Sequence, residues 1–292
     1  MTLRHSLLAL VVVVIWGLNF VVIDEGLKGV PPLVFLAMRF TLVVIPAIFF
    51  VRPPTIGWRN VLLIGSFLSF GQFVLLYIAL AIGMPAGLAS LVLQTQVVLS
   101  VIVSALILKE SPSRRQVVGI VIGMAGLGVV IFGHGNEAPW LPLVVTLLAA
   151  LSWAVGNVLS RRAKSTSSLS LVVWSGAIVP IPSLALALLF DGPTVVGESL
   201  ANLSVIAILS TVYTAVGASL VGYGIWNFLL SRYPTSAVVP FTLLIPIIGI
   251  ITAWLVQGEV PTLTQLVGGA IMIAGLSAAV VQRSFRPRGR SD

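Results

Sequence analysis

The chain has 292 residues, of which 58% are hydrophobic and 8% are charged, and its formal net charge is +8. A soluble fold cannot hide this much apolar surface from water, so the composition predicts an integral membrane protein. The positive charge does not indicate nucleic-acid binding, because the cations stand in short clusters between apolar runs, as topology signals do. The chain has no cysteine, which excludes disulfides and thiol catalysis.

Charges, prolines and glycine clusters divide the chain into ten apolar runs of about 20 residues, the length with which an α-helix crosses a bilayer. We expect an all-α protein with helices over residues 4–23, 32–51, 60–82, 85–108, 114–133, 140–160, 168–190, 203–230, 234–257 and 263–283. The first run resembles a signal peptide. It continues to Asp24 without a small-residue cleavage pattern, so we assign it to the first span.

An internal repeat organises the chain, because Pro85–Leu127 returns 149 positions later as Pro234–Leu276. Between Glu110 and Leu127, 9 of 18 positions are identical in the second copy, including an E-x-P turn and several glycines. We therefore expect two five-helix repeats, over residues 1–135 and 136–283, and a basic tail over 284–292.

The distribution of cations predicts the orientation of the chain. Of the 16 lysines and arginines, 14 fall on one side of the predicted spans, which places both termini in the cytoplasm by the positive-inside rule. Five spans per repeat invert the second copy relative to the first, so Glu110 is expected inside and Glu259 outside. Inverted repeats around a central cavity are typical of transporters that work by alternating access.

Several motifs resemble the drug/metabolite transporter superfamily of the EamA type. They are Trp16-Gly17-Leu18-Asn19-Phe20, Arg39-Phe40 and the E-x-P turn followed by a glycine-rich helix in both halves. Ala149–Arg162 is similar to the YddG-type branch of aromatic amino-acid exporters. The resemblance implies ten spans in two halves and a small-molecule substrate, and relatives carry amino acids, sugars, nucleosides or cationic drugs. Ser175 and Gly176 stand near the place of Arg39 in the second copy.

Arg39 is the one permanent charge within a predicted span. It is expected either to contact a substrate carboxylate or an outer gate, or to snorkel or pair with Asp24, Glu25 or helix carbonyls. Trp16 and Trp153 fall near mid-span and either stack against a guest or pack between helices.

Other polar and aromatic residues at membrane depth are candidates for the cavity wall, with helix packing as the alternative. The candidate substrate-binding residues are Trp16, Asn19, Arg39, Tyr77, Gln94, Thr95, Gln96, Trp153, Asn157, Tyr223, Trp226 and Thr242. Prolines that free carbonyls or weaken helices are candidate hinges or gates: Pro85, Pro234, Pro240 and Pro246. The repeated glycines Gly119, Gly123, Gly126, Gly268, Gly269 and Gly275 are expected in close-packed helix faces, with a dimer contact left open.

No motif for catalysis, nucleotide binding, a metal or a cofactor occurs in the chain. No acidic residue lies inside a predicted span, which favours a facilitative carrier over a proton-coupled one. The sequence thus predicts an exporter of neutral, especially aromatic, amino acids in the bacterial inner membrane, for which a monomer suffices. A carrier of another solute, a channel and an intramembrane enzyme remain alternatives.

Overall fold

The computed structural model describes residues 1–133, 139–164 and 168–280, and all regular elements in these ranges are helical. The predicted boundary at 135 and the tail 284–292 lie outside the described residues. Eight helical stretches are long and apolar enough to cross a membrane: Leu3–Leu27, Trp58–Ala81, Ala86–Leu108, Arg114–Phe132, Trp140–Arg162, Leu169–Phe190, Val205–Arg232 and Val239–Gln257. The stretches Pro32–Ile48 and Leu263–Ala278 are apolar but shorter.

The first half of the chain contains α1 (Leu3–Leu27), α2 (Pro32–Ile48), α3 (Trp58–Ile64), η1 (Gly65–Gly71), α4 (Gln72–Ala81), α5 (Ala86–Val92), α6 (Thr95–Leu108) and α7 (Arg114–Phe132). The second half contains α8 (Trp140–Arg162), α9 (Ser168–Gly176), α10 (Pro180–Phe190), α11 (Gly192–Ala201), α12 (Val205–Val212), η3 (Tyr213–Gly222), α13 (Tyr223–Arg232), α14 (Thr235–Val238), η4 (Val239–Leu244), α15 (Ile245–Gln257) and α16 (Leu263–Val280).

Three predicted boundaries were wrong. Helix α1 continues to Leu27, so Asp24 and Glu25 lie in its last turn instead of in a loop. Helix α2 ends at Ile48, two residues after Pro46, which cannot donate a backbone hydrogen bond. Helix α11 occupies a segment that its Asp, Gly and Pro residues had marked as a loop, because Pro193 is acceptable in the first turn of a helix.

Irregular helical segments recur at repeat-related positions. The π-helical segments η1 and η3 interrupt the third and eighth apolar runs, and residues 65–71 shifted by 149 fall within Tyr213–Gly222. The fourth run breaks between α5 and α6, and the ninth begins with the 3₁₀ segment η4. Such segments often occur at hinges or functional sites, since they change the hydrogen-bond ladder of the helix.

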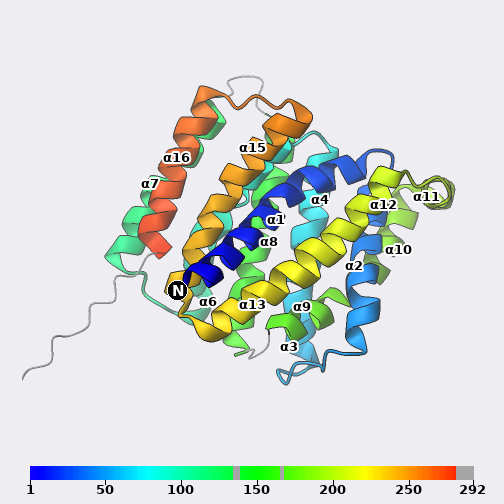
Figure 1. The fold of residues 1–292 in the computed structure, drawn as a ribbon, viewed down its shortest axis with the longest axis horizontal. Helices are drawn as coiled ribbons and strands as arrows, with labels where there is room; N and C mark the ends of the chain where they lie inside the picture. The colour runs from blue at the N-terminus through cyan, green and yellow to red at the C-terminus, as the bar shows by residue number, and fades with distance from the viewer. Residues whose placement is uncertain (134–138, 165–167, 281–292) are drawn as a thin grey trace, which may run out of the picture.

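Helices from the two halves are interleaved in space (Figure 1). Helix α1 crosses the centre and packs against α12, η3, α13 and α15, whereas α8 packs against α3, η1, α4 and α6. Helices α7 and α16 lie side by side at one edge, and α2 and α10 lie together toward the other. Each half therefore contributes neighbours to the other, so neither half buries its apolar faces alone.

The repeated turn after the fourth and ninth runs has the same local structure in both copies. Lys109 and its counterpart Gly258 both adopt the left-handed conformation at a helix C-terminus. The next helix then begins with a capping box, in which Ser113 pairs with Gln116 and, in the second copy, Thr262 pairs with Gln265. The repeated glutamines are thus helix caps.

The predicted glycine-rich faces meet between α7 and α16 of the same chain. A Cβ on Gly126 would lie 2.5 Å from the Met272 nitrogen and 2.6 Å from the Gly268 oxygen, and one on Gly275 would lie 2.5 Å from the Gly123 nitrogen. Only glycine permits this approach of the two backbones, so these residues hold the two helices together.

A substitution in this seam is expected to separate α7 from α16. Gly126→Leu should destabilise the fold by about 1–3 kcal/mol or more, because backbone atoms of α16 cannot move aside as a flexible side chain does. Gly128→Leu is the matched control, since a Cβ at Gly128 meets only Phe132, at 4.0 Å. Thermal unfolding of the detergent-purified variants tests this prediction, and equal midpoints for the two variants would contradict it.

Candidate functional site

A buried guanidinium lies between the two halves of the chain. Arg39 on α2 is 2% exposed, and it donates hydrogen bonds to the Tyr77 hydroxyl (3.0 Å) and to Ser219 Oγ (3.1 Å). Its Cζ lies 4.3 Å from the centre of the Phe73 ring. Within the described part of the chain no carboxylate forms an ion pair with it. Arg39 therefore neither snorkels nor pairs with Asp24 or Glu25, and its charge is solvated by hydroxyls and rings.

Three of the predicted aromatic residues form one cluster. The Trp16 ring on α1 lies 5.1 Å from that of Tyr223 and 5.3 Å from that of Trp226, both on α13. The Trp16 indole donates to the Ala218 carbonyl at 3.0 Å. Tilted aromatic rings of this kind pack against one another and also suit an aromatic guest.

The charge and the aromatic cluster meet on η3. Trp16 bonds the carbonyl of Ala218, and Arg39 bonds the side chain of the next residue, Ser219. Ser219 in turn donates to the Thr214 carbonyl, five residues earlier. The widened π-helical turn thus brings an aromatic surface and a cation to neighbouring positions.

The second half repeats this architecture without the charge. On α8, Ser152 donates to the Phe67 carbonyl of η1 (2.8 Å), and on α9, Ser175 bonds Ser69 of η1 (2.9 Å). Ser175 thus takes the position relative to η1 that Arg39 takes relative to η3. The contacts with η1 and η3 are thus similar, but the side chains that make them differ in charge.

The break between α5 and α6 is joined to η4 by a side chain. Gln94 donates to the Thr242 carbonyl at 2.9 Å. Pro246 lies four residues after Thr242 and has no N–H with which to reach this carbonyl. The carbonyl instead accepts hydrogen bonds from the Ile245 backbone N–H and from Gln94. Pro240 lies within η4, and Pro85 and Pro234 immediately precede α5 and α14.

Several buried polar atoms near these contacts have no hydrogen-bond partner in the part of the chain that the structure describes. They are Asn19 Oδ1, Arg39 Nε, Thr95 Oγ1 and both amide atoms of Asn227. Asn19 is one turn along α1 from Trp16, and Asn227 directly follows Trp226. An unpaired polar group in a low-dielectric interior is unfavourable, so each of these atoms is a candidate contact for a polar ligand.

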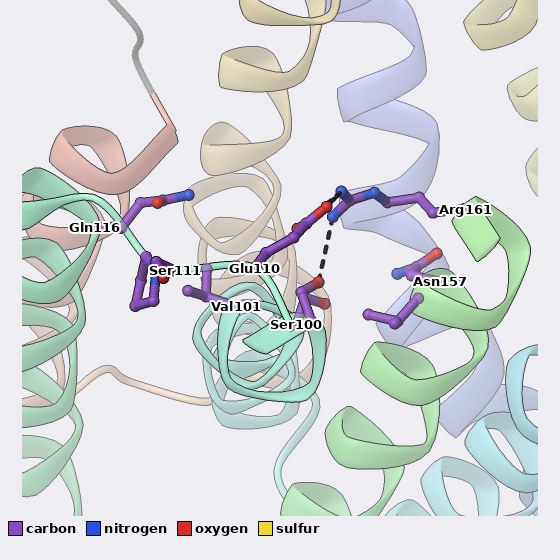
Figure 2. Close-up of a pocket in the computed structure, with 10 residues that line it drawn as sticks. Ser100, Val101, Glu110, Ser111, Gln116, Asn157 and Arg161 are labelled. Carbon is purple, nitrogen blue, oxygen red and sulfur yellow. Dashed lines mark hydrogen bonds and ion pairs between the residues drawn. The ribbon is translucent and has the colours of Figure 1, made fainter. Parts of the chain in front are cut away.

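A separate cavity of about 140 Å³ lies at the end of α6 and α8, which we call the basic end because Lys109, Arg114, Arg115, Arg161 and Arg162 stand there. Its lining residues are Ser100, Val101, Ser104, Glu110, Ser111, Pro112, Gln116, Asn157, Val158 and Arg161. Figure 2 shows Glu110 and Arg161 pointing toward one another from the α6–α7 loop and α8.

Arg161 joins three elements at this cavity. It donates to both oxygens of Glu110, at 2.7 and 3.0 Å, and to Ser104 Oγ at 3.2 Å. The side chains of Arg161 and Glu110 are 58% and 50% exposed, so water screens the ion pair.

The opposite end, which we call the acidic end, has different chemistry. The Gln257 amide donates to Asp24 (2.6 Å) and to Glu25 (2.9 Å), and Lys28 forms an ion pair with Glu25 that raises the lysine pKa. Within residues 1–133, 139–164 and 168–280, Glu259 forms no ion pair, unlike its repeat partner Glu110. It accepts the backbone N–H groups of Ala86 and Gly87 at the start of α5.

The structure thus brings some predicted residues together and separates others. Arg39 contacts Tyr77, Trp16 contacts Tyr223 and Trp226, and Gln94 contacts Thr242. Asn157 alone among the predicted residues lines the cavity at the basic end. Trp153 packs against the main apolar core, and Gln96 is half-buried.

Sequence reasoning missed the roles of Ser219 and of the Arg161–Glu110 pair. Neither Ser219 nor Arg161 is among the candidate residues that the sequence predicts. Comparison of the two halves could have drawn attention to the Arg161–Glu110 pair, because the shift of 137 positions relates Arg161 to Asp24.

An all-helical fold with apolar surfaces, a buried polar centre and no catalytic constellation among the described residues defines a multi-pass membrane protein. The chain matches the EamA-like transporter family over residues 3–132 and again over 140–281. The chain belongs to this family, and it is therefore a transporter and not an enzyme.

Relatives of known name agree with this assignment. The chain is 42% identical to a "Probable amino-acid metabolite efflux pump" of Salmonella typhimurium, covering 99% of this chain and 100% of that protein. It is also 42% identical to a protein of the same name from Escherichia coli, covering 94% of each. A solved crystal structure with 21% identity superposes with a TM-score of 0.67 over 98% of this chain and 99% of that one, which supports the fold alone.

The position of the Trp16 ring can be tested with a matched pair of glycines. A Cβ on Gly222 would lie 2.6 Å from Trp16 Nε1, so Gly222→Ala should displace the ring and lose its hydrogen bond, at a cost of about 1 kcal/mol. Gly224 has open space around it, and Gly224→Ala should stabilise the helix by about 0.5–1 kcal/mol. Thermal midpoints of the two variants should shift in opposite directions, and a shared direction would refute the assigned contact.

Proposed function

We propose that this protein exports neutral amino acids, especially aromatic or large apolar ones, from the bacterial cytoplasm across the inner membrane. The carrying observation is the buried centre, where Arg39 and the Trp16 cluster meet on η3. A guanidinium without a carboxylate partner favours the carboxylate of an amino acid, and the aromatic rings favour its side chain.

The unpaired amides beside this centre support the same substrate class. Asn19 and Asn227 hold buried polar atoms without a hydrogen-bond partner among the described residues, and such atoms suit the ammonium and carboxylate of a zwitterion. The names of the two 42% identical relatives also refer to amino-acid metabolites.

The transport cycle is proposed to be alternating access between two inverted five-helix repeats. Support comes from the symmetry of the contacts, in which α1 meets η3 as α8 meets η1. The irregular segments at repeat-related positions are places where helices can change conformation. We therefore propose facilitated transport driven by the substrate gradient, with a monomer as the working unit and both termini cytoplasmic.

Flux into proteoliposomes tests the proposed substrate and coupling. Vesicles that contain the purified protein should take up labelled phenylalanine in saturable counterflow, and an imposed proton gradient should leave the rate unchanged. Movement of a sugar or nucleoside without amino-acid flux would overturn the substrate, and dependence on the gradient would overturn the facilitative mechanism.

Arg39 variants test which group the centre holds, within the same assay. Arg39→Gln should raise the half-saturating concentration of phenylalanine about 10-fold or more, because a charge-assisted hydrogen bond contributes about 1.5–3 kcal/mol. Inhibition by phenylalaninamide, which has no carboxylate, should change little. Equal loss for both ligands would instead assign Arg39 to the scaffold.

A further inference from the structure

The cavity at the basic end has the chemistry of a zwitterion site. It places a guanidinium, a carboxylate, an amide and hydroxyls around about 140 Å³ of space, from Arg161, Glu110, Asn157, Ser100 and Ser104. An α-amino acid carries a carboxylate and an ammonium on one carbon, which match the guanidinium and the carboxylate of this set.

We propose that this cavity is a loading site for the head group of the amino acid, in which the substrate opens the Arg161–Glu110 ion pair. The substrate carboxylate replaces Glu110 on Arg161, and the substrate ammonium replaces Arg161 on Glu110. Every charge keeps a partner during the exchange. This inference rests on the proposed function, because it assumes an amino-acid substrate.

The ion pair is suited to such an exchange. Both side chains are at least half exposed, and an ion pair in that setting contributes little to stability. Ser100 also lines the cavity, and its buried Oγ has no hydrogen-bond partner among the described residues, so a polar group that is not used by the protein lies beside the site. Asn157 lies one helical turn before Arg161 on the same wall.

Opening the pair also has a structural consequence. Arg161 on α8 holds Ser104 on α6 and Glu110 on the loop to α7. A substrate that takes over the guanidinium releases the direct link from α8 to this loop. Binding at the basic end is thus coupled to the contact that keeps these elements together.

The acidic end lacks an equivalent site. The shift of 137 positions that relates Trp153 to Trp16 relates Arg161 to Asp24, so a carboxylate stands where the basic end has a guanidinium. Glu259, the counterpart of Glu110, is occupied by the backbone of α5. A cation at this end, Lys28, stands at another position and pairs with Glu25, so we place the loading site at the basic end alone.

The test compares three ligands as inhibitors of labelled phenylalanine counterflow, applied to the basic end in oriented membrane vesicles. Phenylalanine has both charges, N-acetylphenylalanine has only the carboxylate, and phenylalaninamide has only the ammonium. Arg161→Gln should raise the inhibition constants of phenylalanine and N-acetylphenylalanine about 10-fold or more without weakening phenylalaninamide. Glu110→Gln should raise the inhibition constants of phenylalanine and phenylalaninamide and leave that of N-acetylphenylalanine unchanged.

Controls separate this site from a merely structural ion pair. Arg162→Gln removes the same charge from the next position of α8, outside the cavity lining, and should change none of the three constants. Arg161→Lys keeps the charge and should show a smaller loss than Arg161→Gln, which also guards against a misfolded variant. When the three ligands are applied to the acidic end, the Arg161 variants should not selectively raise the inhibition constants of phenylalanine and N-acetylphenylalanine.

Two failures are distinguishable. Suppose that the wild-type protein carries phenylalanine and that the Arg161 and Glu110 variants change the inhibition constants of all three ligands equally. This result would overturn the loading site and leave the proposed function standing. If the wild-type protein carries another solute and no amino acid, both the proposed function and the zwitterion site fail.

Discussion

The structure depends on one constraint: inside a bilayer, polar groups must find partners within the protein. The chain meets this constraint with contacts between its halves. Side chains of Gln94, Trp16 and Ser152 donate hydrogen bonds to backbone carbonyls of η4, η3 and η1, respectively. Because these bonds tie irregular helical segments to their neighbours, the places where the helices are least regular are also the places where the halves meet.

Related positions in the two halves of the chain carry side chains of different charge. Arg39 and Ser175 hold comparable positions against η3 and η1, yet only one of them is charged. Glu110 pairs with Arg161 while Glu259 caps α5. The proposed alternating access relies on the repeat of the fold, and these unequal charges distinguish the basic end of the molecule from the acidic end.

The all-helical membrane class, the family and nearly all helical runs could be predicted from sequence, because hydropathy and the repeat are strong signals. Boundaries failed where Asp24 and Glu25 extend α1 and where α11 forms among loop-like residues. The aromatic cluster was predicted as a set of candidates, but its partners were not. The contact of Arg39 with Ser219, 180 residues away, depends on the π-helical turn, and no periodicity in the sequence indicates such a turn.

Distances at the two ends of the molecule test the proposed alternating access most directly. The chain has no cysteine, so spin labels can be placed cleanly at Ser111→Cys with Arg162→Cys at the basic end, and at Lys28→Cys with Val260→Cys at the acidic end. All four residues are exposed. Adding phenylalanine should lengthen the distance at one end and shorten it at the other. Unchanged distances at both ends, in protein that transports phenylalanine, would contradict the account.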